Sequence, residues 1–147
     1  MAPIKILLVE DSKFLRIATE RALVRAGYIV CSAEDGEQAI QMAQERLPDL
    51  ILLDMLLPKT SGRDVLIALK KETATAHIPV VVLTGLSIKN AERLRADGAF
   101  AFLEKSSLEL DKGARVLLAM LADIIKKLSN PESRDNFPVK SAASGSG

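Results

Sequence analysis

The stretch Ile4–Asp11, IKILLVED, decides the fold class of this chain. A nearly continuous run of Ile, Leu and Val is typical of a strand that is buried on both faces of a parallel sheet. Comparable runs recur at Leu50–Leu53, Val80–Leu83 and Phe100–Leu103. Each run leads into a charged or hydroxyl residue. We therefore expect parallel strands with polar residues at their carboxyl ends.

Segments with apolar residues at helical spacing separate these strands. The pattern predicts a further strand at 29–33 and helices over 12–26, 37–46, 63–72, 88–97 and 108–128. Gly27, Pro48 and Gly98 lie where helices are expected to end. Because crossovers between parallel strands are right-handed, five such β–α units predict an α/β fold with a doubly wound, five-stranded, flavodoxin-like parallel sheet. In the first helix, the expected apolar positions are Phe14, Ile17, Ala18 and Ala22.

Length and composition fit one soluble domain. The 147 residues are 48% hydrophobic and 27% charged. The net charge of +1, without a long basic run, does not predict nucleic acid or a membrane surface as a partner. Cys31 is the only cysteine, and no apolar stretch is long enough to span a bilayer, so we expect a cytoplasmic protein. We expect a folded domain over 1–128 and a flexible tail or linker over 129–147, where Ser, Asn, Pro and Gly dominate.

The polar residues at the strand ends predict one site. In open α/β sheets, ligands bind outside the carboxyl ends of the strands. Glu10, Asp11 and Asp54 would meet there and repel one another unless a cation intervenes. Mg²⁺ prefers oxygen ligands, whereas zinc would call for His or Cys, which are missing here. Thr84 and Lys105 add a hydroxyl and an ammonium, which suit a phosphoryl group.

An aspartate beside a bound metal can act as a nucleophile and form an acyl phosphate. Each of these residues also has an ordinary explanation, since an acid can cap a helix, a threonine favours a strand and a lysine is commonly solvated. Their joint placement at one edge of the sheet favours the functional interpretation.

These residues resemble the receiver domain of two-component response regulators. The resemblance covers about residues 4–128 and rests on Glu10-Asp11, on the segment from Asp54 to Gly62, on Thr84-Gly85 and on Phe102–Lys105. It implies that Asp54 is the phosphoacceptor and that Thr84 and Lys105 contact the phosphoryl group. It also implies a Mg²⁺ site formed by Asp11, Asp54 and the backbone carbonyl of Leu56, with Glu10 assisting through water. Phe102 occupies the aromatic switch position, and Ser106 stands where receivers usually have proline.

The resemblance also implies partners. A histidine kinase or histidine phosphotransfer protein would supply the phosphoryl group, and we expect Leu15, Ala18 and Ser106 to lie in its footprint. A protein target would read the face formed by the fourth helix, the fifth strand and the fifth helix, which could also pair two copies of the chain. The receiver would not be an enzyme beyond accepting the phosphoryl group and slowly losing it. Leu56 and Leu86 would shield the phosphoaspartate from water and prolong its lifetime.

Several alternatives stand beside this hypothesis. The domain could be a catalytically silent interaction module or a fragment of a larger regulator. A phosphoaspartate hydrolase of the haloacid dehalogenase kind is disfavoured, because such an enzyme needs an aspartate where Leu56 stands. A flavodoxin-like nucleotide binder is disfavoured too, because Asp11-Ser12-Lys13 replaces a glycine-rich phosphate loop.

Overall fold

In the computed structural model of this chain, the described residues are 3–57, 59–84, 91–104 and 113–129. The chain divides into two compact units, Met1–Ser106 and Ser107–Gly147, and each is described by itself. The described residues of the first unit form β1 (Lys5–Val9), α1 (Lys13–Arg25), β2 (Ile29–Ala33), α2 (Gly36–Arg46), β3 (Leu50–Asp54), α3 (Gly62–Lys71), β4 (Val80–Thr84), α4 (Ala91–Ala96) and β5 (Ala101–Glu104). The second unit contains α5 (Gly113–Leu128).

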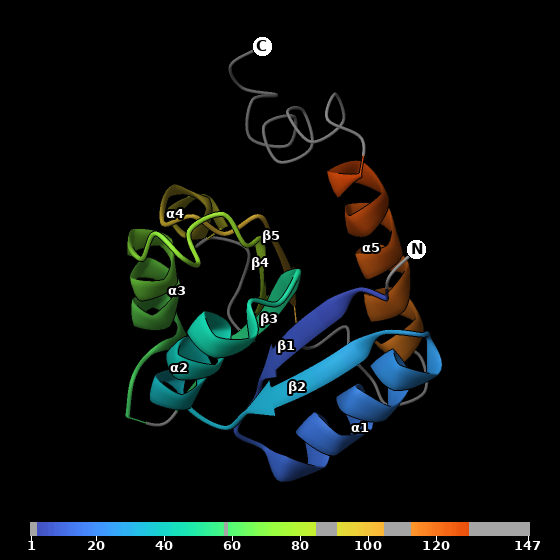
Figure 1. The fold of residues 1–147 in the computed structure, drawn as a ribbon. Coiled ribbons are helices and arrows are strands. Elements are labelled where there is room, and N and C mark those ends of the chain that lie inside the picture. Colours follow the sequence, from blue (N-terminus) through green and yellow to red (C-terminus); the bar gives the residue numbers. More distant parts are fainter. Residues whose placement is uncertain (1–2, 58, 85–90, 105–112, 130–147) are drawn as a thin grey trace. The chain divides into compact units, whose positions relative to one another are not determined.

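The five strands form one parallel sheet in the order β2-β1-β3-β4-β5 (Figure 1). The predicted fold class is thus confirmed. In the register of the sheet, Val9 pairs with Leu53 and Asp54 pairs with Leu83. The ends of β1, β3 and β4 therefore lie together at one edge.

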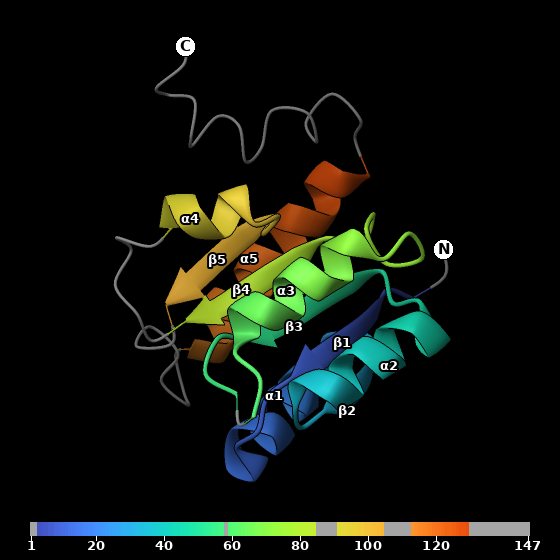
Figure 2. The same cartoon turned by 90° about the vertical axis from the view of Figure 1, so that its left-hand side faces the viewer.

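Within the first unit, helices lie on both faces of the sheet. The helices α2, α3 and α4 lie on one face, and α1 lies on the other (Figure 2). Buried residues of α2, α3 and α4 pack with those of the strands into one core, which includes Ala39, Ala43, Val65, Leu66, Leu69, Leu94, Leu7, Ile51, Leu53 and Val82. Burial of these apolar side chains is the main force that holds the layers together.

Capping residues fix where the helices next to the site begin. The hydroxyl of Ser12 accepts a hydrogen bond from the amide of Leu15 and caps α1. The hydroxyl of Ser61 accepts one from the amide of Asp64 and caps α3. Each cap satisfies an amide that the helix itself leaves unpaired. Helix α1 thus starts shortly after the acid pair that follows β1, and α3 starts after a loop that leads from Asp54 to Ser61.

The predicted elements agree with the observed ones to within a few residues. The predicted helix over 88–97 corresponds to α4, and that over 108–128 corresponds to α5, but 85–90 and 105–112 lie outside the described residues. Gly27 and Gly98 follow α1 and α4 with φ of 101° and 112°, a backbone conformation that favours glycine. No helix within the described ranges is long and apolar enough to cross a membrane.

The expected apolar face of α1 is wrong at Phe14, whereas Ile17, Ala18 and Ala22 are partly buried. Phe14 is 66% exposed, and Leu23 is the only fully buried residue of α1, all of which is described. The side chain of Arg16, in contrast, is only 14% exposed. Because each residue turns the helix by about 100°, the directions of Phe14 and Arg16 are about 160° apart around the helix axis. The helix is oriented by the polar contacts of Arg16, which carry Phe14 to the outside.

Candidate functional site

Three carboxylates meet at the ends of β1 and β3. Ligand oxygens of Glu10, Asp11 and Asp54 all lie within 4.8 Å of one another. Glu10 is 3% exposed and Asp54 is 1% exposed, whereas Asp11 is exposed. Two buried acids and one exposed acid form a cluster in which a cation would offset their mutual repulsion. The expected juxtaposition of these three acids is therefore found.

Backbone amides orient two of the carboxylates. The amide of Leu56 donates to Oδ1 of Asp54 at 3.0 Å, and the amide of Ser12 donates to Oε2 of Glu10 at 3.1 Å. In each case the donor lies two residues after the acid, so the turn that leaves the strand supplies the hydrogen bond. These bonds fix the carboxylate positions before any ligand binds.

Arg16 belongs to the site, although the sequence reasoning missed it. Its Nη1 donates to the carbonyl oxygen of Glu10 at 3.0 Å and to that of Asp11 at 3.4 Å. Its Nη2 lies 3.8 Å from the carboxylate of Glu34. The guanidinium therefore holds the loop that carries the acid pair. An arginine between the apolar residues Leu15 and Ile17 of a predicted helix was the signal that could have revealed it.

Gly62 lets α3 approach the strand that carries Asp54. A Cβ atom at Gly62 would lie 2.5 Å from Cα of Met55 and 2.6 Å from the carbonyl oxygen of Asp54. The amide of Gly62 also donates to the carbonyl oxygen of Met55 at 3.1 Å. Only a residue without a side chain fits there, so the glycine fixes the loop from Asp54 to α3.

The remaining predicted site residues are described only in part. The backbone of Thr84 ends β4 and pairs with Glu104 of β5, one position beyond the pair formed by Asp54 and Leu83. The side chain of Thr84 and the whole of Lys105, Ser106 and Leu86 lie outside the described parts of the structure.

Two further expectations concern surface residues near the site. Leu15 and Ala18, the two described residues of the expected docking surface, are half-buried. Leu56 is 62% exposed and so does not turn inward to pack.

Phe102 lies on β5, where its backbone pairs with Val82. The ring is half-buried and packs against the core. The guanidinium carbon of Arg95, on α4, lies 5.0 Å from the ring centroid. Phe102 is thus held between the core and a cation from α4.

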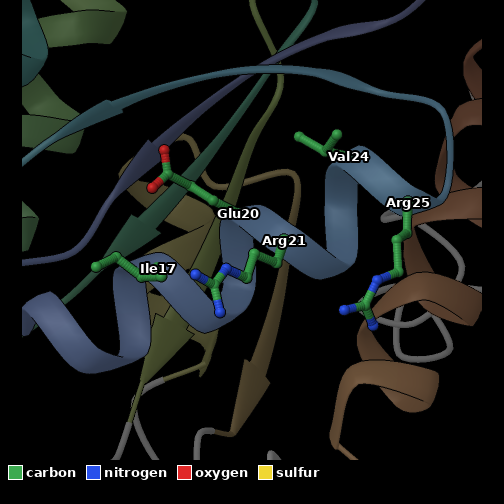
Figure 3. A pocket seen from close by; sticks show the side chains of 5 residues that line it. All are labelled: Ile17, Glu20, Arg21, Val24 and Arg25. Atoms are coloured by element: carbon green, nitrogen blue, oxygen red, sulfur yellow. The ribbon is translucent and has the colours of Figure 1, made fainter.

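A separate hollow of about 410 Å³ lies over α1. It is lined by side chains of one helix, Ile17, Glu20, Arg21, Val24 and Arg25 (Figure 3). The hollow is wide open, and its lining includes none of the acids or other residues of the site described above.

Comparisons with known proteins identify the family. Residues 6–116 match the response regulator receiver domain. The chain is 37% identical over 105 residues to the polar-differentiation response regulator DivK of Brucella anthropi, an alignment that covers 70% of this chain and 85% of that protein. It is 40% identical over 116 residues to the gliding motility regulatory protein of Myxococcus xanthus, an alignment that covers 78% of this chain but 15% of that protein.

A solved structure agrees with these relatives. The phosphorylated cyanobacterial phytochrome response regulator RcpA superposes with a TM-score of 0.70 at 30% sequence identity, over 81% of this chain and 91% of that one. The chain therefore belongs to the receiver domain family of two-component response regulators. Members of this family interact with histidine kinases and with output targets and are in general not enzymes in their own right.

Proposed function

We propose that this chain is a phosphoacceptor that takes a phosphoryl group on Asp54 in a Mg²⁺-dependent reaction and thereby switches a protein-interaction surface. The main observation behind this proposal is the acid cluster, in which ligand oxygens of three carboxylates lie within 4.8 Å of one another. Asp54, the proposed nucleophile, is 1% exposed. The likeness to the phosphorylated cyanobacterial response regulator RcpA supports the proposal.

The cluster suits Mg²⁺ in its chemistry. Its donors are carboxylate oxygens, without any His or Cys, which favours a hard cation over zinc. We assign the metal to Asp11, Asp54 and the backbone carbonyl of Leu56, with Glu10 assisting through water. When bound, Mg²⁺ supplies positive charge that offsets the acids and the phosphoryl oxygens.

Asp54 supplies the nucleophile. One of its carboxylate oxygens forms the new O–P bond while the N–P bond of a phosphohistidine donor breaks, and the electron pair of that bond stays on the histidine nitrogen. Oδ1 accepts the hydrogen bond from Leu56, which holds the carboxylate plane during attack. Thr84 and Lys105 are proposed to stabilise the phosphoryl oxygens with a hydroxyl and an ammonium.

The phosphodonor is proposed to be a histidine kinase or histidine phosphotransfer protein that docks on α1. Phe14, at 66% exposure, extends the expected docking surface of Leu15, Ala18 and Ser106. Leu15→Asp should slow transfer from a histidine donor and spare acetyl phosphate, whereas equal losses would indicate misfolding.

We propose that the output is a protein contact made by the face of α4, β5 and α5. We further propose that the chain acts in the cytoplasm and that neither nucleic acid nor a membrane is its partner. Two copies of the chain could pair through the same face, and sedimentation with and without beryllofluoride tests that pairing. We further propose that residues 1–128 form the receiver domain and that 129–147 are a flexible tail. Whether the domain acts alone or within a larger regulator stays open.

A silent interaction module is the second candidate, and nothing specific favours it. It would call for a broken acid cluster, whereas Glu10, Asp11 and Asp54 are intact. The decisive experiment incubates the chain with acetyl phosphate over a range of Mg²⁺ concentrations. We expect metal-dependent phosphorylation that Asp11→Ala abolishes. Phosphorylation of Asp11→Ala at the wild-type rate would refute the site.

A further inference from the structure

Besides the burial of Leu94 in the core, two contacts made by arginine side chains tie α4 and the residue that follows it to neighbouring elements. Nε of Arg63 donates to Oδ2 of Asp97 at 2.6 Å, and Nη2 of Arg63 donates to Oδ1 at 3.2 Å. This bidentate ion pair joins the first turn of α3 to the residue that follows α4. The second contact is the guanidinium of Arg95 over the ring of Phe102. We call these four residues, Arg63, Asp97, Arg95 and Phe102, the α4 latch.

The first contact connects α4 to the phosphoacceptor. Arg63 directly follows Gly62, whose backbone is packed against Met55 and Asp54 without room for a side chain. A shift of the loop after Asp54 therefore moves the backbone that carries Arg63. The bidentate geometry transmits that shift better than a single point contact would, because it fixes orientation as well as distance.

The second contact is weak enough to be reversed. A cation over an aromatic face contributes a modest attraction. The Nε of Arg95 is buried and has no hydrogen-bond partner among the described residues, which offsets part of that attraction. A contact of this strength can bias an equilibrium between two positions of Phe102 without freezing it.

We propose that the observed position of Phe102 is its resting position and that the α4 latch stabilises it, so that Arg95 is a positioning residue that sets how readily phosphorylation of Asp54 switches the output surface. This inference rests on the proposed function, because it assigns the regulation of the same site. A ligand that favours the switched position must overcome the latch, and removal of the latch therefore raises the apparent affinity for that ligand.

Beryllofluoride with Mg²⁺, a mimic of the phosphoryl group, is the probe. Arg95→Met should raise its apparent affinity about two- to fivefold, the range that a single cation–π contact supports. Arg95→Lys, which keeps a cation, should give a smaller increase. Asp97→Asn, which breaks the ion pair with Arg63, should change affinity in the same direction. Arg93→Met is the matched control, because Arg93 is an exposed arginine on the same helix.

A spectroscopic measurement separates positioning from simple stability. With 4-fluorophenylalanine at the four Phe positions, Phe102→Leu assigns the ring resonance. Without beryllofluoride, Arg95→Met should move that resonance toward its position in the beryllofluoride complex. In a Phe102→Leu background, Arg95→Met should no longer change the affinity.

Unchanged affinity and an unchanged resonance in Arg95→Met would overturn the latch, as would an equal affinity change in the Phe102→Leu background. If the wild type does not bind beryllofluoride at all, the proposed function fails instead. A ring resonance that differs from the wild type in unliganded Arg95→Met but not in unliganded Arg93→Met would then still show that Arg95 holds Phe102, and an unchanged resonance in Arg95→Met would overturn it.

Discussion

The amide of Leu56 donates a hydrogen bond to Oδ1 of Asp54 at 3.0 Å, while the side chain of Leu56 stays 62% exposed. Leu56 thus orients Asp54, the proposed phosphoacceptor, through its backbone and leaves its own apolar side chain exposed. These two features can be separated by mutation, because a substitution at this position keeps the amide and changes only the side chain.

The exposed leucine predicts a long-lived phosphorylated state. An apolar side chain beside the phosphoaspartate excludes water and cannot orient it for attack. Replacing Leu56 with Asn and Leu86 with Glu should shorten the half-life roughly tenfold, well below the effect of a full general base. Leu56→Met is the apolar control. Time-resolved loss of phosphoaspartate measures the effect, and a wild-type half-life no longer than that of the polar double mutant would refute the shielding.

Arg16→Ala should loosen the loop that bears the acid pair. The substitution removes two hydrogen bonds to the carbonyls of Glu10 and Asp11 from a mostly buried guanidinium. We expect a loss of about 1–3 kcal/mol in the free energy of unfolding and a several-fold weaker affinity for Mg²⁺. Arg25→Ala, at an exposed arginine in the last turn of α1, is the control. Equal Mg²⁺ affinity in both variants would contradict the role of Arg16.

Much of this architecture is predictable from the sequence because buried parallel strands leave continuous apolar runs. The strands that end at Val9 and Asp54 follow from such runs, and the acid cluster follows from the placement of their ends. The orientation of α1 is not predictable in this way. Apolar residues occur on several sides of α1, so the helix period alone does not say whether Phe14 or Arg16 faces inward.

The contacts around α4 are also beyond sequence reasoning. Arg63 and Asp97 are separated by 34 positions and meet only in the folded chain. Charged side chains are commonly solvated, so neither Arg63 nor Asp97 by itself predicts an ion pair. The close approach of backbone atoms at Gly62 is likewise not predictable, because a glycine after a serine in the sequence indicates only a turn.

Gly62→Ala should damage the site through the backbone. The added methyl would lie 2.5–2.6 Å from backbone atoms of Met55 and Asp54, which cannot move as a flexible side chain does. We expect about 1–3 kcal/mol of destabilisation together with slower phosphorylation. Gly27→Ala is the matched control, because it strains a residue with φ of 101° but meets no atom within 4 Å. Denaturant unfolding and phosphorylation rates should separate the variants, and wild-type phosphorylation by Gly62→Ala would contradict the prediction.

The partly buried amine of Lys70 should make the free energy of unfolding depend on pH in a specific direction. Its Nζ donates to the carbonyls of Ala76 and Ile78, and burial lowers the pKa of Lys70 below the ordinary value of 10.5. Between the lowered folded pKa and 10.5, the unfolded chain binds the extra proton, so the contribution of Lys70 to stability rises with pH across that window.

The stability of the wild type relative to Lys70→Met should therefore increase as pH rises toward 10.5. The comparison cancels other groups that titrate in this range, because both variants share them. Lys71→Met, at the exposed neighbouring lysine, should show no such trend. A pH-independent difference for Lys70→Met, obtained from urea unfolding, would contradict the assignment.

Intact-mass spectrometry with acetyl phosphate and Mg²⁺ tests the central claim most directly. Acceptance of a phosphoryl group by the buried carboxylate of Asp54 predicts one added phosphoryl group per wild-type chain, none without Mg²⁺ and none on Asp54→Asn. Peptide mapping should place the group on Asp54 itself. A wild-type chain that stays unmodified under these conditions, or an Asp54→Asn chain modified to the same extent, would contradict the account.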